Sequence, residues 1–172
     1  MKKEEVVSLI RSVPDFPKKG ILFRDITPLL ANPEAFKSII DEFVVLCKNK
    51  GITKIVALES RGFIFGAPLA YALGVGFVPI RKRGKLPYKK LSIEFDLEYG
   101  KDIIEIHQDA LDKNDRVLLV DDLLATGGTM SAAIKLIEQL GAKIELCAFM
   151  CELSALKGKE KLSAPSTSLI VF

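Results

Sequence analysis

Hydrophobic residues fall into two kinds of segment along the chain: short continuous runs, and longer stretches in which they recur at helical spacing. The continuous runs are too short for helices and rich in strand-forming residues, so they predict buried strands at 54–59, 76–80, 116–121, 143–150 and 168–172. The longer stretches predict helices at 2–11, 33–49, 62–74 and 128–140. Pro14 and Pro17 end the first helix and force a loop through Gly20.

The predicted strands and helices alternate along the chain. Strands that are apolar throughout, rather than at every second position, are typical of a parallel sheet with both faces covered. The sequence therefore predicts the α/β fold class, with one domain over 1–172 built on a doubly wound parallel sheet.

One segment, 92–107, breaks this alternation. Its first half interleaves apolar and acidic side chains, namely Ile93, Phe95, Leu97 and Tyr99 with Glu94, Asp96 and Glu98. Period-two patterning predicts a strand with one solvated face, and we expect an antiparallel hairpin that turns at Gly100 and Lys101. The basic stretch 81–90 before it predicts a long mobile loop.

Composition narrows the class of protein further. The chain has 172 residues, 49% of them hydrophobic and 27% charged, which is typical of a globular domain. A net charge of +3 is too small to indicate nucleic-acid binding. No stretch resembles a secretory leader and no apolar run approaches the ~20 residues that span a bilayer. We therefore expect a soluble cytoplasmic protein that binds neither membrane nor nucleic acid.

The metal-ligating residue types are sparse. Cys47, Cys147 and Cys151 form no CxxC pair and are interpreted as small buried hydrophobic residues. The single histidine, His107, rules out the usual histidine-rich zinc sites and is interpreted as a hydrogen-bonded structural residue.

Candidate chemistry concentrates in 117–129, VLLVDDLLATGGT. Asp121 and Asp122 come at the end of a predicted strand, and in open α/β sheets ligands bind beyond such carboxyl ends. The loop behind them leads into a helix whose first N–H groups attract anions. Its glycines allow close approach of a phosphate, and its threonines add hydroxyl donors. The adjacent carboxylates suit sugar hydroxyls or a hydrated Mg²⁺, so a ribose 5-phosphate fits.

A purely structural interpretation of the same residues stays open at this point. The acid pair would then cap the following helix, and the glycines would only shape a turn. The GxxxxGK[ST] pattern of nucleotide-binding loops is absent, and the GVG at 74–76 lacks the third glycine of the dinucleotide-binding pattern.

The whole string 117–129 resembles the phosphoribosyl-pyrophosphate motif of the type I phosphoribosyltransferases. Three further stretches are similar to the adenine phosphoribosyltransferases within that family: DFPKKGILFRDITPLL (15–30), ESRGFIFGAPLA (59–70) and LEYGKDIIEIHQDAL (97–111). The resemblance covers most of the chain from Ile10 to Lys161. It implies the family's α/β fold with a small N-terminal hood over about 1–30, and a mobile loop and hairpin over about 81–107.

Matching motifs imply a role for each of several residues. The phosphoribosyl group would be held by Asp121, Asp122, Ala125, Thr126, Gly127, Gly128 and Thr129. Pyrophosphate would meet Ser60, Arg61, Arg81, Lys82, Lys85 and Tyr99. Adenine would lie against Leu22, Phe23, Arg24 and Leu123. Glu98, the acid associated with the purine, and Arg61 would be the catalytic residues.

The resemblance also implies the reaction. Phosphoribosyl would pass from phosphoribosyl pyrophosphate to N9 of adenine, giving AMP and pyrophosphate, in a homodimeric enzyme of purine salvage. Mg²⁺ would be held mainly by substrate near Asp121 and Asp122, with no direct protein ligand assigned. Two rivals stay open, a transferase for another purine such as xanthine and a regulatory sensor that binds nucleic acid.

The chain departs from the family in the basic loop. Where the family usually continues KLPGPT, Leu86 and Pro87 are followed here by Tyr88, Lys89 and Lys90. The difference bears on loop closure and pyrophosphate release. Tyr88 among basic residues would also offer one stacking face to a single-stranded nucleic acid.

Overall fold

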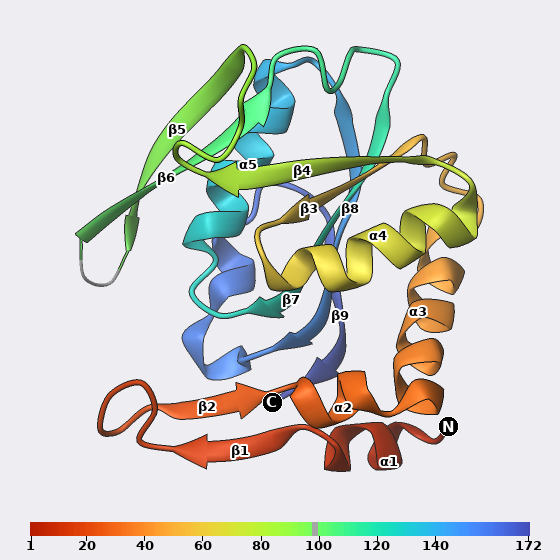
Figure 1. Cartoon of the computed structure of the whole chain (residues 1–172), viewed down its shortest axis with the longest axis vertical. Coiled ribbons are helices and arrows are strands. Elements are labelled where there is room, and N and C mark those ends of the chain that lie inside the picture. Colours follow the sequence, from red (N-terminus) through yellow and green to blue (C-terminus); the bar gives the residue numbers. More distant parts are fainter. Residues whose placement is uncertain (98–99) are drawn as a thin grey trace. The chain divides into compact units, whose positions relative to one another are not determined.

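The computed structural model of the chain describes residues 1–97 and 100–172. The chain divides into two compact units, Met1–Glu42 and Phe43–Phe172, and each is described by itself (Figure 1). The single domain expected from the sequence therefore stays a prediction.

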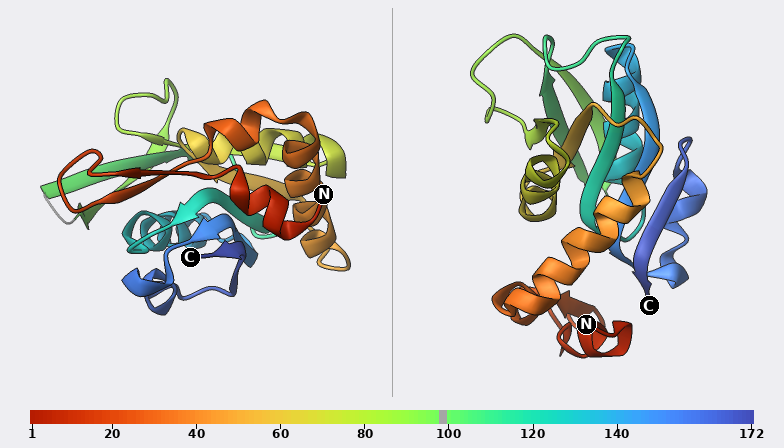
Figure 2. Two further views of the ribbon diagram at one scale, coloured as in Figure 1. Left: turned by 90° about the horizontal axis from the view of Figure 1, so that it is seen from below. Right: turned by 90° about the vertical axis from the view of Figure 1, so that its right-hand side faces the viewer.

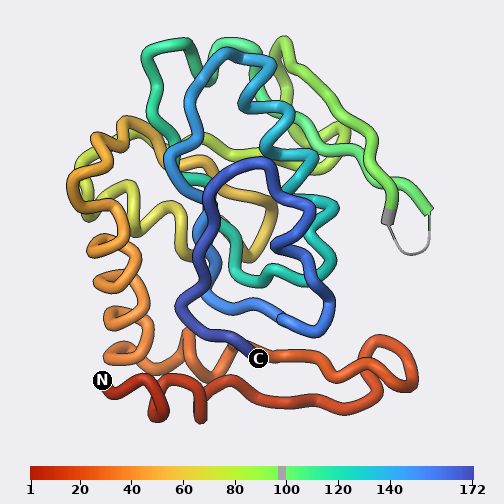
Figure 3. The backbone as a smooth tube through the Cα atoms, turned by 180° about the vertical axis from the view of Figure 1, so that it is seen from behind, coloured from red at the N-terminus to blue at the C-terminus, as the bar shows by residue number. Residues whose placement is uncertain are grey.

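The first unit contains two short helices, a hairpin and most of a longer helix. Its elements are α1 Lys3–Ser8, β1 Arg11–Pro14, β2 Leu22–Asp25, α2 Thr27–Ala31 and α3 Pro33–Cys47, the last residues of which belong to the second unit. The antiparallel strands β1 and β2 run side by side, with Val13 opposite Phe23 (Figure 3). Asn32 caps α3, because its Oδ1 accepts a hydrogen bond of 3.0 Å from the backbone N–H of Ala35.

This hairpin corrects the sequence prediction. The helix expected over 2–11 ends at Ser8, and Pro14 closes a strand instead of merely breaking a helix. Proline has no backbone N–H to donate. It is tolerated there because β1 has only four residues and pairs with a single strand, β2.

The second unit is built on a sheet of seven strands in the order β5-β6-β4-β3-β7-β8-β9. Its elements are β3 Lys54–Leu58, α4 Arg61–Leu73, β4 Gly76–Lys82, β5 Lys90–Leu97, β6 Gly100–His107, β7 Arg116–Leu124, α5 Gly128–Gln139, β8 Lys143–Glu152, the short 3₁₀ turns η1 Ser154–Leu156 and η2 Gly158–Lys161, and β9 Ser166–Val171. Strands β3, β4, β7, β8 and β9 are parallel, whereas β5 and β6 are antiparallel. The predicted α/β class with a mostly parallel sheet is confirmed.

Helices α4 and α5 cover opposite faces of this sheet (Figure 2). A Cβ added to Gly66 of α4 would lie 2.7 Å from the Cβ of Ala57, so α4 packs closely on that face of β3. Val56 and Leu58, whose side chains point the other way, join the buried cluster that contains Ile134 and Ile137 of α5. Both faces are thus covered, as the continuously apolar strands predicted.

The predicted antiparallel hairpin is present, but its turn is not where we expected. Leu97 pairs with Gly100, and Asp96 pairs with Lys101, so both predicted turn residues belong to β6. The expected basic loop over 81–90 is also shorter, because Arg81 and Lys82 extend β4 and Lys90 begins β5.

The three cysteines are buried and free, which confirms their interpretation as packing residues. Burial raises the pKa of the Cys147 thiol to about 12. The interpretation of His107 as a fully hydrogen-bonded residue is wrong, since its buried Nε2 has no hydrogen-bond partner among the residues described. No helix in 1–97 or 100–172 is long and apolar enough to cross a membrane.

Candidate active site

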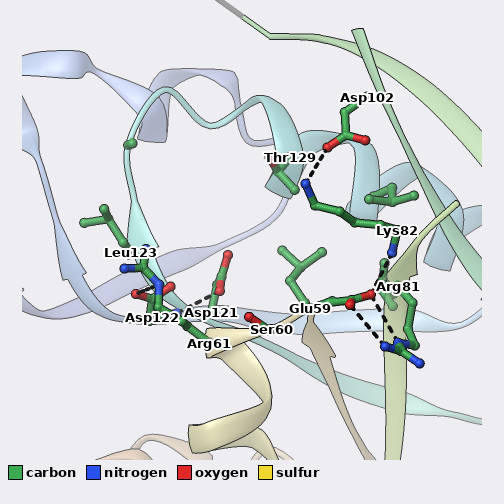
Figure 4. A pocket seen from close by; sticks show the side chains of 14 residues that line it. Glu59, Ser60, Arg61, Arg81, Lys82, Asp102, Asp121, Asp122, Leu123 and Thr129 are labelled. Atoms are coloured by element: carbon green, nitrogen blue, oxygen red, sulfur yellow. Dashed lines mark hydrogen bonds and ion pairs between the residues drawn. The ribbon is translucent and has the colours of Figure 1, made fainter. Parts of the chain in front are cut away.

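The carboxyl ends of three parallel strands, β3, β4 and β7, meet at one edge of the sheet. A cavity of about 410 Å³ opens there (Figure 4). It is lined by Leu58, Glu59, Ser60, Arg61, Ile80, Arg81, Lys82, Asp102, Ile104, Asp121, Asp122, Leu123, Ala125 and Thr129. The site therefore gathers residues from four strands, from the loops that follow two of them, β3 and β7, and from the first turns of α4 and α5.

The acid pair predicted from the sequence lies near the end of β7. The backbone N–H of Asp122 donates a hydrogen bond of 2.9 Å to Oδ1 of Asp121. Asp122 is only 4% exposed, and its Oδ2 lies 2.9 Å from Nε of Arg61, the first residue of α4. The pair is thus fixed from two sides, by its own backbone and by a cation from the neighbouring element.

Burial is the main reason why the pKa values of Asp121 and Asp122 are raised. It raises the pKa of Asp121 well above its usual value, and the charge of Asp122 raises that pKa further. Burial also raises the pKa of Asp122, although the Arg61 guanidinium opposes this rise. A ligand that offers hydroxyl donors or positive charge would favour the ionised form of both groups.

Residues 125–127 connect β7 to α5 and, with the first residues of that helix, surround a small second cavity of about 80 Å³. That cavity is lined by Asp121, Leu123, Leu124, Ala125, Thr126, Gly127, Gly128, Thr129 and Met130. Gly127 has φ +80°, and α5 begins at Gly128. The free N–H groups of the first helical turn therefore lie beside the loop, as an anion site requires.

Gly158 of η2 packs directly against this loop. A Cβ on Gly127 would lie 2.3 Å from the carbonyl oxygen of Gly158, and a Cβ on Gly158 would lie 2.1 Å from the carbonyl oxygen of Ala125. Neither position has room for a side chain, so the two glycines let the two backbones touch.

Each of the three cations that line the cavity faces a carboxylate (Figure 4). Besides the Arg61–Asp122 pair, Arg81 lies 3.1 Å from Glu59 and Lys82 lies 3.1 Å from Asp102. Lys85 does not line the cavity, but its carbonyl oxygen accepts a hydrogen bond of 3.4 Å from Nη1 of Arg81.

Glu59 is the most extensively bonded of these carboxylates. It accepts hydrogen bonds of 3.1 Å from Nε and from Nη2 of Arg81, and one of 3.0 Å from the backbone N–H of Lys82. Burial alone would raise its pKa, but these hydrogen bonds and the charges of Arg81 and Lys85 lower it. Glu59 therefore stays ionised and holds the end of β4 against the end of β3.

The remaining predicted site residues fall in three places. Glu98 and Tyr99 lie outside the described residues. Leu22, Phe23 and Arg24 lie on β2 of the first unit, where Phe23 meets Phe16 edge-on at 5.2 Å between ring centroids. Leu123 lines the main cavity in the second unit. The grouping of these residues around adenine stays a prediction.

The predicted site residues did not include Glu59 and Asp102, which line the cavity, or Gly158, which packs against the loop. Glu59 could have been predicted as a site residue, because it comes directly after an apolar strand and before Ser60 and Arg61. Asp102 sits in a hairpin whose acidic residues were interpreted as a solvated face, and nothing in the sequence around Gly158 indicated a packing role.

Comparison with known proteins agrees with this arrangement. Residues 26–170 match the phosphoribosyl transferase domain family. Adenine phosphoribosyltransferase of Clostridium kluyveri is 59% identical over 153 residues, which cover 89% of each chain. The crystal structure of adenine phosphoribosyltransferase from Thermoanaerobacter pseudethanolicus has a TM-score of 0.95 and 52% identity, with 98% of this chain and 99% of that one covered.

A structure with lower sequence identity to this chain contains bound ligands. The enzyme of Trypanosoma brucei, in complex with AMP, pyrophosphate and ribose-5-phosphate, has a TM-score of 0.88 and 30% identity, with 99% of this chain and 82% of that one covered. The chain belongs to the phosphoribosyl transferase family and, within it, to the adenine phosphoribosyltransferases.

Proposed function

We propose that the protein transfers the phosphoribosyl group of phosphoribosyl pyrophosphate to N9 of adenine, giving AMP and pyrophosphate in purine salvage. The observation that carries this proposal is the cavity at the carboxyl edge of the sheet, where an acid pair and a glycine loop adjoin three cations. A relative with 30% identity is known with AMP, pyrophosphate and ribose-5-phosphate together, the three molecules that such a reaction relates.

The phosphoribosyl group would occupy the side of the cavity formed by β7 and its loop. Asp121 and Asp122 accept hydrogen bonds from the ribose hydroxyls. These hydrogen bonds stabilise the ionised carboxylates, which burial alone disfavours. The loop of residues 125–129 and the first turn of α5 donate backbone N–H groups to the 5-phosphate. Two contacts at opposite ends of one sugar fix its anomeric carbon in a defined position.

Pyrophosphate would occupy the opposite side, near Ser60, Arg61, Arg81 and Lys82. As the bond to the anomeric carbon breaks, negative charge develops on the departing oxygens and positive charge on the sugar. Guanidinium and ammonium groups stabilise that departing charge. Because each of these cations already faces a carboxylate, pyrophosphate must compete with Asp122, Glu59 and Asp102 for them.

The charges in the cavity suit a ligand that brings its own cation. Four carboxylates line it, Glu59, Asp102, Asp121 and Asp122, against the three cations. Among the described residues, no three groups of the metal-binding types converge on one point. These residues fit Mg²⁺ held mainly by oxygens of phosphoribosyl pyrophosphate, with Asp121 and Asp122 near it; bound there, Mg²⁺ would neutralise charge on the leaving group.

By the family resemblance, Leu22, Phe23, Arg24 and Leu123 would contact adenine. Glu98 would act on the imidazole edge of the purine, where a carboxylate can accept or relay the N9 proton. Lys85 and Tyr99 would belong to the segments that close over pyrophosphate. The family resemblance further supports a homodimer that works in the cytoplasm.

Product analysis tests this proposal. The protein is incubated with phosphoribosyl pyrophosphate, Mg²⁺ and one base at a time: adenine, hypoxanthine, guanine or xanthine. AMP and pyrophosphate should form in equal amounts with adenine, and the other bases should give far slower turnover. Preferred turnover of xanthine would favour the rival transferase, and no turnover with any base would favour the regulatory sensor.

A further inference from the structure

The basic segment between β4 and β5, residues 83–89, is fixed at both of its ends by one buried carboxylate, Glu105 of β6. This side chain is 3% exposed, and it is not among the residues that line the cavity, although Asp102 and Ile104 of the same strand are. Successive side chains of a strand point to opposite faces, so Glu105 lies on the face opposite Ile104, which is the face of its ladder partner Arg81.

Three donors meet this carboxylate. Oε2 accepts a hydrogen bond of 3.0 Å from the backbone N–H of Gly84 and lies 3.0 Å from Nζ of Lys90. Oε1 accepts a hydrogen bond of 3.3 Å from Oγ of Ser92. Gly84 comes just after β4, and Lys90 is the first residue of β5, so Glu105 ties together the two flanks of the intervening segment.

Further contacts hold the same segment at its base. Lys90 Nζ also donates to the carbonyl oxygen of Leu86 at 3.2 Å, and the Leu86 side chain is buried. The backbone N–H of Arg83 donates to the carbonyl oxygen of Ile103 at 3.0 Å. In the antiparallel pair of β4 and β6, Arg81 is the residue directly opposite Glu105.

Lys90, the first residue of β5, is the cation that pairs with Glu105. A buried carboxylate needs a partner, and among the described residues Lys90 is the only cation paired with it. Burial would raise the pKa of Glu105, but its contacts with Lys90, Gly84 and Ser92 lower it, so the group is ionised and the ion pair persists at neutral pH.

We propose that Glu105, through Lys90 and Gly84, is a positioning residue that holds the basic segment so that Arg81 and Lys82 face the pyrophosphate side of the cavity. The inference rests on the proposed function. It extends that function, because Glu105 touches no substrate and acts only through the cations it aligns. Neutralising Glu105 should therefore weaken the binding of ligands at the pyrophosphate end of the cavity and leave binding at the 5-phosphate end unchanged.

Calorimetric titration of Mg²⁺–pyrophosphate and of AMP separates the two ends. For Glu105→Gln we expect pyrophosphate to bind about ten- to a hundredfold more weakly, since a misplacement of about 1 Å can cost about a hundredfold. AMP affinity should change less than about twofold. Equal weakening of both ligands, or unchanged pyrophosphate binding, would overturn the proposal.

A matched control is Glu145→Gln. Glu145 also pairs with two cations, Arg116 at 3.1 Å and Lys143 at 2.8 Å, but those residues begin β7 and β8 at the other end of the strands. This variant should melt at a lower temperature and bind both ligands as the wild type does. Weaker pyrophosphate binding by Glu145→Gln would make the Glu105 effect one of general stability and overturn the proposal.

Lys90→Met supplies a second route if Glu105→Gln fails to fold. It should show the same selective loss of pyrophosphate, and the double variant should lose no more than the worse single variant, because coupled partners are not additive. Unchanged pyrophosphate binding by Lys90→Met, or fully additive losses, would overturn the proposal. A wild type that binds neither AMP nor pyrophosphate would refute the proposed function itself; a wild type that binds both, with unaffected variants, would refute only the role of Glu105.

Discussion

At the scale of single residues, the acid pair of β7 is a source of instability that a ligand can relieve. Asp121 and Asp122 are adjacent; Asp121 is half-buried, and Asp122 is buried and forms an ion pair with Arg61. Their raised pKa values mean that removing their protons is harder in the folded chain than in the unfolded one. Functional sites commonly lower the stability of the fold in this way, because the groups that bind ligand are not arranged for maximal stability.

The pH dependence follows from the sign of these shifts. Between the ordinary pKa of an aspartate, about 3.9, and the raised value, the folded state binds more protons than the unfolded state. Stability from this pair is therefore present at low pH and is lost as the pH rises through that interval. Asp121→Asn removes the charge and keeps the oxygen that accepts the Asp122 N–H.

We therefore expect Asp121→Asn, without ligand, to melt at a higher temperature than the wild type at pH 7, with a smaller difference at pH 4. Each kcal/mol of relief corresponds to about 2–4 °C for a chain of this length. Calorimetric melting at both pH values measures the effect. Asp109→Asn on the exposed surface is the control and should change little. A lower melting temperature for Asp121→Asn at pH 7 would contradict the assignment.

A second residue-scale prediction concerns Glu98. Glu98→Gln keeps the shape of the side chain but removes the charge, so it should lower kcat by about a hundredfold or more if this carboxylate handles the N9 proton. Glu94→Gln should be nearly silent, because Glu94 and its ion-pair partner Lys101 are both exposed. Steady-state rates of AMP formation measure both. Similar rates for the two variants would exclude the role assigned to Glu98.

At the scale of elements, η2 fixes the loop between β7 and α5 by contact of backbone with backbone. Gly158 leaves no room for a Cβ against Ala125 and Gly127. A short 3₁₀ turn that has no predicted chemistry thus defines where the loop between β7 and α5 lies.

Gly158→Ala should displace this loop and weaken AMP binding by about tenfold or more, since small displacements of positioning groups are costly. Binding of Mg²⁺–pyrophosphate at the other end of the cavity should change less than about twofold. Gly74→Ala is the control: a Cβ there meets open space, but φ of +66° strains it, so stability falls and both affinities persist. Equal effects of the two variants on AMP binding would refute the role of Gly158.

The elements also show what sequence reasoning can and cannot give. The strand and helix of 117–139 were predictable because the apolar run, the acids and the glycines each indicate the same strand–loop–helix unit. The hairpin of β1 and β2 was missed because strands of four residues, one closed by Pro14, carry no periodic pattern. The ion pairs of Glu59 and Asp102 depend on which strands are neighbours in the sheet, whereas the pair of Glu105 and Lys90 spans the hairpin of β5 and β6.

At the scale of the whole molecule, the order of the strands in the sheet determines where the cavity lies. The sheet brings the ends of β3, β4 and β7 together, so that the residues proposed to bind the sugar and those proposed to bind pyrophosphate line one cavity. The family membership of the chain makes phosphoribosyl transfer the reaction, and the acid pair makes the location of that transfer testable.

The most direct test is the rate of AMP formation from adenine, phosphoribosyl pyrophosphate and Mg²⁺, measured in parallel for the wild type and for Asp121→Asn/Asp122→Asn. The wild type should turn over, and the double variant, folded by circular dichroism, should be slower by at least about a hundredfold because its sugar is no longer held in place. A folded double variant that makes AMP at the wild-type rate would contradict the location of the site. A wild type that makes no AMP would contradict the reaction.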